Sequence, residues 1–231
     1  DTLRYVLTAN MPENKDNNFT WKDFQTKNNS ELVGILGNFI NRVMVLSHKY
    51  YGGIIPEKTI EFEELTEIKY FATRIAEHIE KYEFRAALTE YMNLARLGNQ
   101  FLQAQEPWKK GDDPEAVKGI MYVATQIAAA LAQFGEPFIP FSSAKMLKMM
   151  NLEQLDWTDE FIATGHQLGE SELIFAKIED EAIEAQINKL QESKAINNMT
   201  NPNAEAQKEL ISFDDFQKMD IRIGTILEAK K

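Results

Sequence analysis

Apolar residues recur three and four positions apart through most of this chain, which is the spacing of helices that bury one face. One such run starts at Ser30, has apolar side chains at positions 32, 36, 39, 40, 43 and 46, and stops at Gly52-Gly53. Similar stripes predict helices over 61–81 and 83–105. The segment 114–134 is apolar nearly all round, so it should be the central helix. Shorter helices are expected at 1–10 (with Asp1 as a cap), 21–25, 144–151 (capped by Ser142-Ser143) and 179–194.

The remaining segments divide the chain. The Asn-rich stretch 11–29 indicates a loop apart from its small helix, and residues 152–178 a loop that returns across the bundle. After residue 211 the pattern changes: Met219, Ile221 and Ile223 alternate as in a strand. The prediction is an all-α antiparallel bundle of about five helices with a short C-terminal β segment. Its parts are 1–22 (a junction from a preceding domain), 23–194 (the bundle), 195–210 (a linker) and 211–231 (the start of a β domain).

Composition narrows the possible functions. With 44% apolar residues among 231, the chain can bury a core, and no apolar run approaches the 18 residues of a membrane span. There is no cysteine, and the three histidines stand in unrelated contexts, so no metal site is expected. The net charge of −11 argues against a broad basic surface for polyanions. Any contact with nucleic acid must therefore be local.

One set of side chains suits such a local contact. Asn38 and Arg42 are four residues apart, so a helix presents them on one face, with Asn41 beside them. Trp108 follows Pro107, which ends a helix. Amide and guanidinium groups can hydrogen-bond the edge of an unpaired base, and an indole can stack on its face. The alternatives are a solvated helix face for Asn38 and Arg42, a core position for Trp108, and a purely structural hydrogen bond for Asn41.

Six segments carry further information, in this order along the chain: Asp1–Tyr5, Gly37–Arg42, Gln105–Lys109, Pro137–Pro140, Gly165-His166 with Leu173–Asp180, and Ile211–Arg222. Together they resemble the methionyl-tRNA synthetase family. Each motif alone recurs by chance, whereas the six in this order are specific. The resemblance covers most of the chain and implies the anticodon-binding bundle of a class I aminoacyl-tRNA synthetase. The last segment is similar to the opening of the OB-fold tRNA-binding module appended to many members.

The resemblance assigns roles to the candidate residues. It implies that Asn38, Arg42 and Trp108 bind the CAU anticodon, with Trp108 stacking on the first base and with Asn38 and Arg42 hydrogen-bonding the exposed edges of the first two bases. Asn41 joins them as a candidate that would support Asn38. The parent enzyme would be a cytoplasmic methionine–tRNA ligase, a homodimer through its OB-fold domain. The catalytic motifs His-x-Gly-His and Lys-Met-Ser-Lys-Ser are absent from this sequence. We therefore expect a piece of a larger protein that binds tRNA without cofactor, any ATP or zinc belonging to the missing catalytic part.

Two other functions stay open at this stage. An acidic helix bundle could be a scaffold that docks another protein and touches no RNA, which the net charge of −11 would suit. The chain could also be the helical domain of a different class I synthetase that reads another anticodon. Binding to stem-loops with and without CAU would separate these possibilities.

Overall fold

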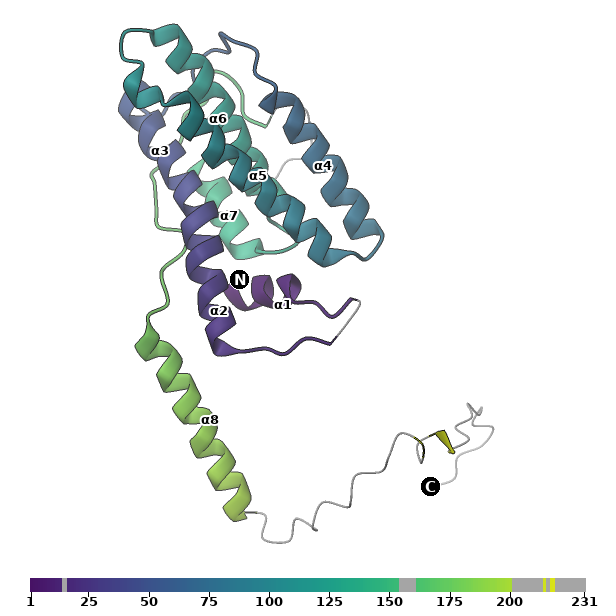
Figure 1. Cartoon of the computed structure of the whole chain (residues 1–231). Coiled ribbons are helices and arrows are strands. Elements are labelled where there is room, and N and C mark those ends of the chain that lie inside the picture. Colours follow the sequence, from purple (N-terminus) through teal and green to yellow (C-terminus); the bar gives the residue numbers. More distant parts are fainter. Residues whose placement is uncertain (14–15, 154–160, 201–213, 215–216, 219–231) are drawn as a thin grey trace, which may run out of the picture. The chain divides into compact units, whose positions relative to one another are not determined.

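Five helices, α3 to α7, pack into a bundle (Figure 1). The computed structural model describes residues 1–13, 16–153, 161–200, 214, 217 and 218. By its internal contacts the chain divides into two units, Asp1–Ile187 and Asn188–Lys231, and the bundle lies in the first. The described residues contain no strand, only an isolated antiparallel bridge between Ile54 and Gln167. The predicted all-α fold class is therefore confirmed.

The helix bounds follow the apolar periodicity closely in the middle of the chain. Three helices expected at 61–81, 83–105 and 114–134 are confirmed, as is the short first helix. In order along the chain, the elements are α1 (Thr2–Ala9), α2 (Trp21–Lys27), the π-helix η1 (Asn28–Gly37), α3 (Asn38–Tyr51), α4 (Glu64–Glu80), α5 (Phe84–Gln105), the 3-10 turn η2 (Pro107–Lys109), α6 (Pro114–Phe134), α7 (Pro140–Met149) and α8 (Asp180–Thr200).

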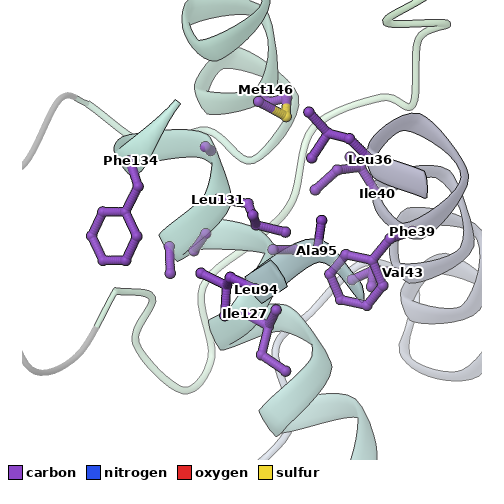
Figure 2. Close-up of a cluster of buried hydrophobic side chains, with 14 of the residues drawn as sticks. Leu36, Phe39, Ile40, Val43, Leu94, Ala95, Ile127, Leu131, Phe134 and Met146 are labelled. Atoms are coloured by element: carbon purple, nitrogen blue, oxygen red, sulfur yellow. The ribbon is translucent and has the colours of Figure 1, made fainter. Parts of the chain in front are cut away.

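Helix α6 lies at the centre of the bundle, as its sequence predicts. It contacts α3, α4, α5 and α7, and every residue from Gly119 to Phe134 is buried. Figure 2 shows part of this core, in which Leu131 and Ile127 of α6 face side chains of α3, α5 and α7. In the part of the chain that the structure describes, α6 alone is long and apolar enough to cross a membrane, yet 94% of that apolar window is buried inside the bundle. Such burial is that of a core helix.

One continuous helix runs from Trp21 to Tyr51, so the predicted division of this segment is wrong. The backbone stays helical through both internal junctions, at Asn28 and at Asn38, so α2, η1 and α3 follow one another without a break. The expected loop through residues 26–29 does not exist. Asn28 and Asn29 disfavour helix by intrinsic propensity. Here their amides bond a distant backbone segment, 176–178, and this tertiary contact outweighs the propensity.

Helix α7 starts earlier than predicted, at Pro140 instead of residue 144. Proline is well suited to the first helical position because its missing N–H would have no partner there. The expected Ser142-Ser143 cap is wrong. The Ser142 N–H donates to the Asp1 carboxylate at 2.6 Å, and the Ser143 hydroxyl donates to the carbonyl of Ala132. Asp1 occupies the N-cap position of its own helix, α1, as expected, but its side chain makes no capping hydrogen bond there.

The C-terminal predictions have mixed outcomes. The helix expected over 179–194 is confirmed, and as α8 it continues to Thr200. The OB-like segment expected at 211–231 falls outside the described residues except for positions 214, 217 and 218, and so do residues 201–210 of the expected linker. The return of residues 161–178 across the bundle is confirmed by hydrogen bonds from this segment to α2, η1, α3 and α7.

Candidate nucleic-acid interface

Three of the predicted site residues lie on the first turns of α3. Asn38 and Asn41 are exposed, and Arg42 is half-buried, while Phe39 and Ile40 between them are fully buried. This alternation follows from the 3.6-residue period, which turns residues 38, 41 and 42 toward solvent and residues 39, 40 and 43 toward the core. The site therefore begins at the rim of the apolar stripe.

Arg42 reaches across to the fourth predicted residue, Trp108. Its guanidinium carbon lies 5.1 Å from the centroid of the indole ring, within the range of a cation–π contact. No acidic side chain of the described residues forms an ion pair with Arg42. In a chain with 36 acidic and 25 basic residues, an arginine held on an aromatic ring with its N–H donors unpaired is available to an external acceptor.

The turn that follows α5 sets the position of Trp108. Glu106 adopts a left-handed conformation (φ 43°) that few non-glycine residues take, and Pro107 then begins a 3-10 turn. Two contacts within this turn support it: the Lys109 N–H donates to the Glu106 carbonyl at 2.8 Å, and the two side chains form an ion pair at 2.8 Å. Pro107 is buried, whereas Trp108 keeps 38% of its surface exposed. The tryptophan is therefore not a core residue.

Arg42 and Trp108 line a shallow cavity of about 250 Å³ at the surface of the bundle. Its other lining residues are Asn41 and, as an apolar floor, Val45 and Leu46. An apolar floor beside an exposed indole, with a guanidinium and an amide at the edge, has the composition of a pocket for a planar heterocycle.

Asn38 is held by a residue that the sequence analysis missed. Its Nδ2 donates to Oδ1 of Asn99 at 3.1 Å, and Asn99 donates in turn to the carbonyls of Ile35 and Ala95. These bonds fix the Asn38 amide, so its Oδ1 is left as the free acceptor. Asn99 comes four residues after Ala95, which lies on the buried stripe of α5. This spacing was the only feature of the sequence that indicated that Asn99 could face α3.

A close helix contact brings Asn99 within reach of Asn38. The Phe39 ring of α3 packs directly over Gly98 of α5, where a Cβ atom would lie only 2.5–2.8 Å from three ring carbons. Helices α3 and α5 contact each other at this point, and they lie side by side in Figure 1. A larger residue at 98 would push the helices apart and lengthen the Asn38–Asn99 bond.

A second cavity, of about 210 Å³, opens on the other side of Asn41. It lies between α3 and a strap, here defined as residues 172–180, which passes beside η1 and the start of α3. Asn38 and Asn41 line it from the helix, and Leu173 and Phe175 line it from the strap. The four predicted residues thus do not form one pocket. Arg42 and Trp108 line the first cavity, Asn38 lines the second, and Asn41 lines both.

The strap is fixed by side chains of the long helix. Asn29 donates to the carbonyl of Ile178 and accepts from its N–H, both at 2.9 Å, as a neighbouring strand would. Asn28 donates to the carbonyl of Ala176 at 2.9 Å, and Gln25 donates to the Ile178 carbonyl and to Asp180. The hydrogen bond from Gln25, and then the charge of Lys22, hold the pKa of Asp180 below its usual value. The sequence showed only the Asn-rich composition, which we interpreted as a loop.

None of the described residues forms a cluster of His, Cys, Asp or Glu that could hold a metal ion. The His166 side chain bonds the backbone: its Nε2 lies 2.7 Å from the carbonyl oxygen of Met150. His166 itself follows Gly165 in a turn. This is the structural role that its position beside a glycine indicates.

Two family models match the chain. One, described as the anticodon binding domain of methionyl tRNA ligase, matches residues 56–195; the other, described as tRNA synthetases class I (M), matches residues 1–44. Trp108 and Asn99 fall in the first match, and Asn38, Asn41 and Arg42 fall in the second. The candidate interface therefore joins residues from both matched segments.

Curated relatives and solved structures agree with these matches. The chain is 54% identical to a methionine–tRNA ligase of Flavobacterium psychrophilum and 51% identical to one of Cytophaga hutchinsonii, in each case over its whole length and 35% of the relative. It thus spans about a third of the curated relatives it matches. A structure of free Mycobacterium tuberculosis methionyl-tRNA synthetase superposes with a TM-score of 0.70 at 19% identity, over 77% of this chain and 38% of that one. This likeness concerns the fold alone.

Proposed function

The chain belongs to the methionyl-tRNA ligase family, and we propose that its helix bundle recognises the CAU anticodon of tRNA through Asn38, Asn41, Arg42 and Trp108. Membership in this family removes the alternative of a different class I synthetase. The proposal goes beyond membership in naming the anticodon and the residues that contact it.

The observation that carries the proposal is the Arg42–Trp108 pair. The indole keeps 38% of its surface exposed and has a guanidinium 5.1 Å from its ring centroid. A base that stacks on the exposed part of the ring would therefore have the Arg42 N–H groups close to its edge. Cytosine offers two acceptors and one donor on its pairing edge, and a site with donors and acceptors in matching places rejects bases with a different pattern. The Arg42 donors and the Asn41 amide, at one cavity, supply both kinds of group.

We further propose that a protein containing this chain together with a catalytic domain attaches methionine to its tRNA with ATP. The names of the relatives support this step. The chain by itself, without His-x-Gly-His or Lys-Met-Ser-Lys-Ser, would bind tRNA and would not form aminoacyl-adenylate. ATP, any zinc ion, dimerisation through the OB-fold domain and a cytoplasmic location belong to the proposal for that larger protein.

The test is a fluorescence-anisotropy titration of the folded chain with a labelled CAU stem-loop and its GAU counterpart, over a series of salt concentrations. Base readout predicts a preference for CAU that persists as salt rises, because counterion release governs only the phosphate contacts. Trp108→Ala should weaken CAU binding by about 1–3 kcal/mol, the usual contribution of a base–aromatic stack.

A matched control is Trp21→Ala, since Trp21 lies on α2 outside the two cavities. Equal affinity of the Trp108→Ala and unmodified chains would rule out Trp108 as the stacking residue. No binding to either stem-loop by a chain shown to be folded would favour the scaffold function.

A further inference from the structure

A third cavity, of about 150 Å³, lies where α1 contacts the long helix and α5 (Figure 1). It shares no lining residue with the two cavities described above. Its floor consists of buried side chains, Tyr5, Leu88 and Met92. Three cations line it, Lys27 from α2 and Arg85 and Arg96 from α5, against one carboxylate, Glu31. In a chain with a net charge of −11, this is a locally positive site.

The cations of this α1–α5 cavity are poorly neutralised by the part of the chain that the structure describes. There, neither Arg85 nor Arg96 forms an ion pair, and Lys27 has only a long one, to Asp23 at 3.8 Å. The Glu13 carboxylate accepts at 2.9 Å from the backbone N–H of Arg85, not from its guanidinium. Arg96 donates one N–H to a carboxamide of its own helix, at 2.9 Å. Most of the guanidinium N–H groups are therefore available to an external acceptor.

The hydroxyl groups of the cavity have no hydrogen to offer a ligand. The Tyr5 hydroxyl donates to the Glu31 carboxylate, and the Thr89 hydroxyl donates to the carbonyl of Arg85 at 2.8 Å. Burial, and then the hydrogen bond to Glu31, raise the pKa of Tyr5, so its proton stays in place at neutral pH. The donors that remain are the cations. They match a ligand whose polar atoms are all acceptors, which is an oxyanion.

The two arginines lie in a row along α5. One face of this helix carries, at three- and four-residue spacing, Arg85, Thr89, Met92, Arg96 and Asn99. Arg85 and Arg96 are eleven residues apart, which is roughly 16 Å along the helix axis. Asn99, the next residue on this face, holds Asn38 of the candidate interface. The same face of α5 therefore connects the cavity to that interface.

We propose that the α1–α5 cavity binds phosphate groups through Arg85, Arg96 and Lys27. A guanidinium matches two phosphate oxygens with two parallel N–H bonds, and the lysine adds a point charge. The phosphodiester backbone of an RNA and a free phosphate or pyrophosphate ion offer the same oxygens. The row along α5 favours the backbone, because successive phosphates can contact both arginines. This site reads no base, so it goes beyond the proposed function and does not depend on CAU recognition.

The first experiment is an anisotropy titration of the folded chain with labelled full-length tRNA, carrying CAU or GAU, over a series of salt concentrations. The double variant Arg85→Gln/Arg96→Gln should weaken binding to both RNAs equally and leave their ratio unchanged. Loss of two phosphate contacts should also reduce the slope of log K against log salt by roughly two. The matched control is Lys118→Gln/Lys148→Gln, which removes the same charge from α6 and α7, outside the cavity.

A substitution with the opposite sign keeps the test independent of folding. Glu31→Gln removes the one carboxylate among the lining residues, and its amide oxygen can still accept from Tyr5. It should strengthen phosphate binding severalfold, since the repulsion of the anion is gone. A damaged fold cannot produce such a gain.

The second experiment is calorimetry of the folded chain with pyrophosphate and no RNA, which identifies the source of the phosphate. Binding that the arginine double variant abolishes, with tRNA affinity unchanged beyond the control, would assign the cavity to a free ion. A loss confined to tRNA would assign it to the backbone. The proposal is overturned if the double variant matches the control in both experiments, or if Glu31→Gln brings no gain in either.

The outcomes also separate this inference from the proposed function. If CAU is not preferred over GAU while the arginine double variant still weakens tRNA binding, the proposed function fails and the phosphate site stands. If Trp108→Ala weakens CAU binding while the arginine double variant behaves as the control with tRNA and pyrophosphate, the reverse holds.

Discussion

Two pairs of asparagines on the same continuous helix have opposite environments. Asn28 and Asn29 in the π-helical part hold residues 176 and 178 of the strap, and Asn28 is 2% exposed. Ten residues further on, Asn38 and Asn41 face solvent; one has a single side-chain partner, and the other has none among the described residues. The first pair completes the fold, and the second leaves hydrogen-bonding capacity for a ligand.

The difference shows what indicates a functional asparagine. It is a side-chain amide that lacks hydrogen-bond partners inside the protein and can therefore bond a ligand. A buried polar group must find partners inside the protein, because leaving it unpaired costs about 1–3 kcal/mol. An exposed amide on a rigid helix carries no such requirement. We therefore propose a binding role for Asn38 and Asn41 and a structural role for Asn28 and Asn29, and substitutions can test that proposal.

The largest effect is expected where α3 packs on α5. Gly98→Ala places a methyl group 2.5–2.8 Å from the Phe39 ring, which is fully buried. Overpacking at such a site should lower the free energy of unfolding by about 3 kcal/mol, measured by urea denaturation. Gly111→Ala is the control, since no atom lies within 4 Å of its Cβ position. Equal stability of the two variants would show that the helices are not in the close contact that positions Asn99.

Asn28→Ala tests the structural pair. It removes the donor to the Ala176 carbonyl and the acceptor of the Thr2 hydroxyl, and it leaves both groups without that partner. We expect a loss of about 2 kcal/mol in the free energy of unfolding. The matched substitution Asn41→Ala should change it by less than about 0.5 kcal/mol, because the residue is exposed. Similar losses in the two variants would contradict the contrast between the pairs.

The parts of the fold that the sequence predicted are those determined locally. The 3.6-residue stripe places Phe39, Leu94 and Leu131 in the core, and Pro107 and Pro114 mark helix boundaries, because periodicity and proline geometry act over a few residues. The loop assigned to residues 26–29 failed for the opposite reason. The partners of Asn28 and Asn29 lie about 150 residues away in sequence, and no local pattern indicates such a contact.

The candidate site also has some features that are determined locally and others that depend on tertiary packing. Asn38 and Arg42 share a helix, so their common face was predictable, and the resemblance to a known family supplied Trp108. The approach of Arg42 to Trp108 depends on how α3 packs beside η2, and the split into two cavities depends on the strap. Both are tertiary features. The sequence alone could therefore name the residues but not their grouping.

Asn99→Ala tests whether Asn38, in the exposed pair, depends on its hydrogen bond to α5. It removes the acceptor that fixes Asn38 and the donor to the carbonyls of Ile35 and Ala95, which are otherwise bonded within helices. The free energy of unfolding should fall by about 1 kcal/mol. Discrimination between CAU and non-CAU stem-loops should also fall, because the freed Asn38 amide would sample several orientations. Asn93→Ala on the same helix is the control, and unchanged discrimination by Asn99→Ala would show that Asn38 needs no such support.

The smallest effect concerns Asp180, at the end of the strap. The hydrogen bond from Gln25 and the charge of Lys22 lower its pKa below the ordinary 3.8, so the folded state favours the carboxylate. The unfolded chain then binds more protons, and stability rises with pH. The contribution is complete at pH well above 3.8 and disappears as the pH falls through the lowered folded-state pKa. Asp180→Asn should therefore lower the Tm at pH 7, and this difference in Tm should shrink as the pH is lowered below 3.8. Because Asp180 is exposed, salt should also reduce the difference at pH 7. A Tm difference that stayed the same at every pH would mean that the carboxylate charge contributes nothing to holding the strap.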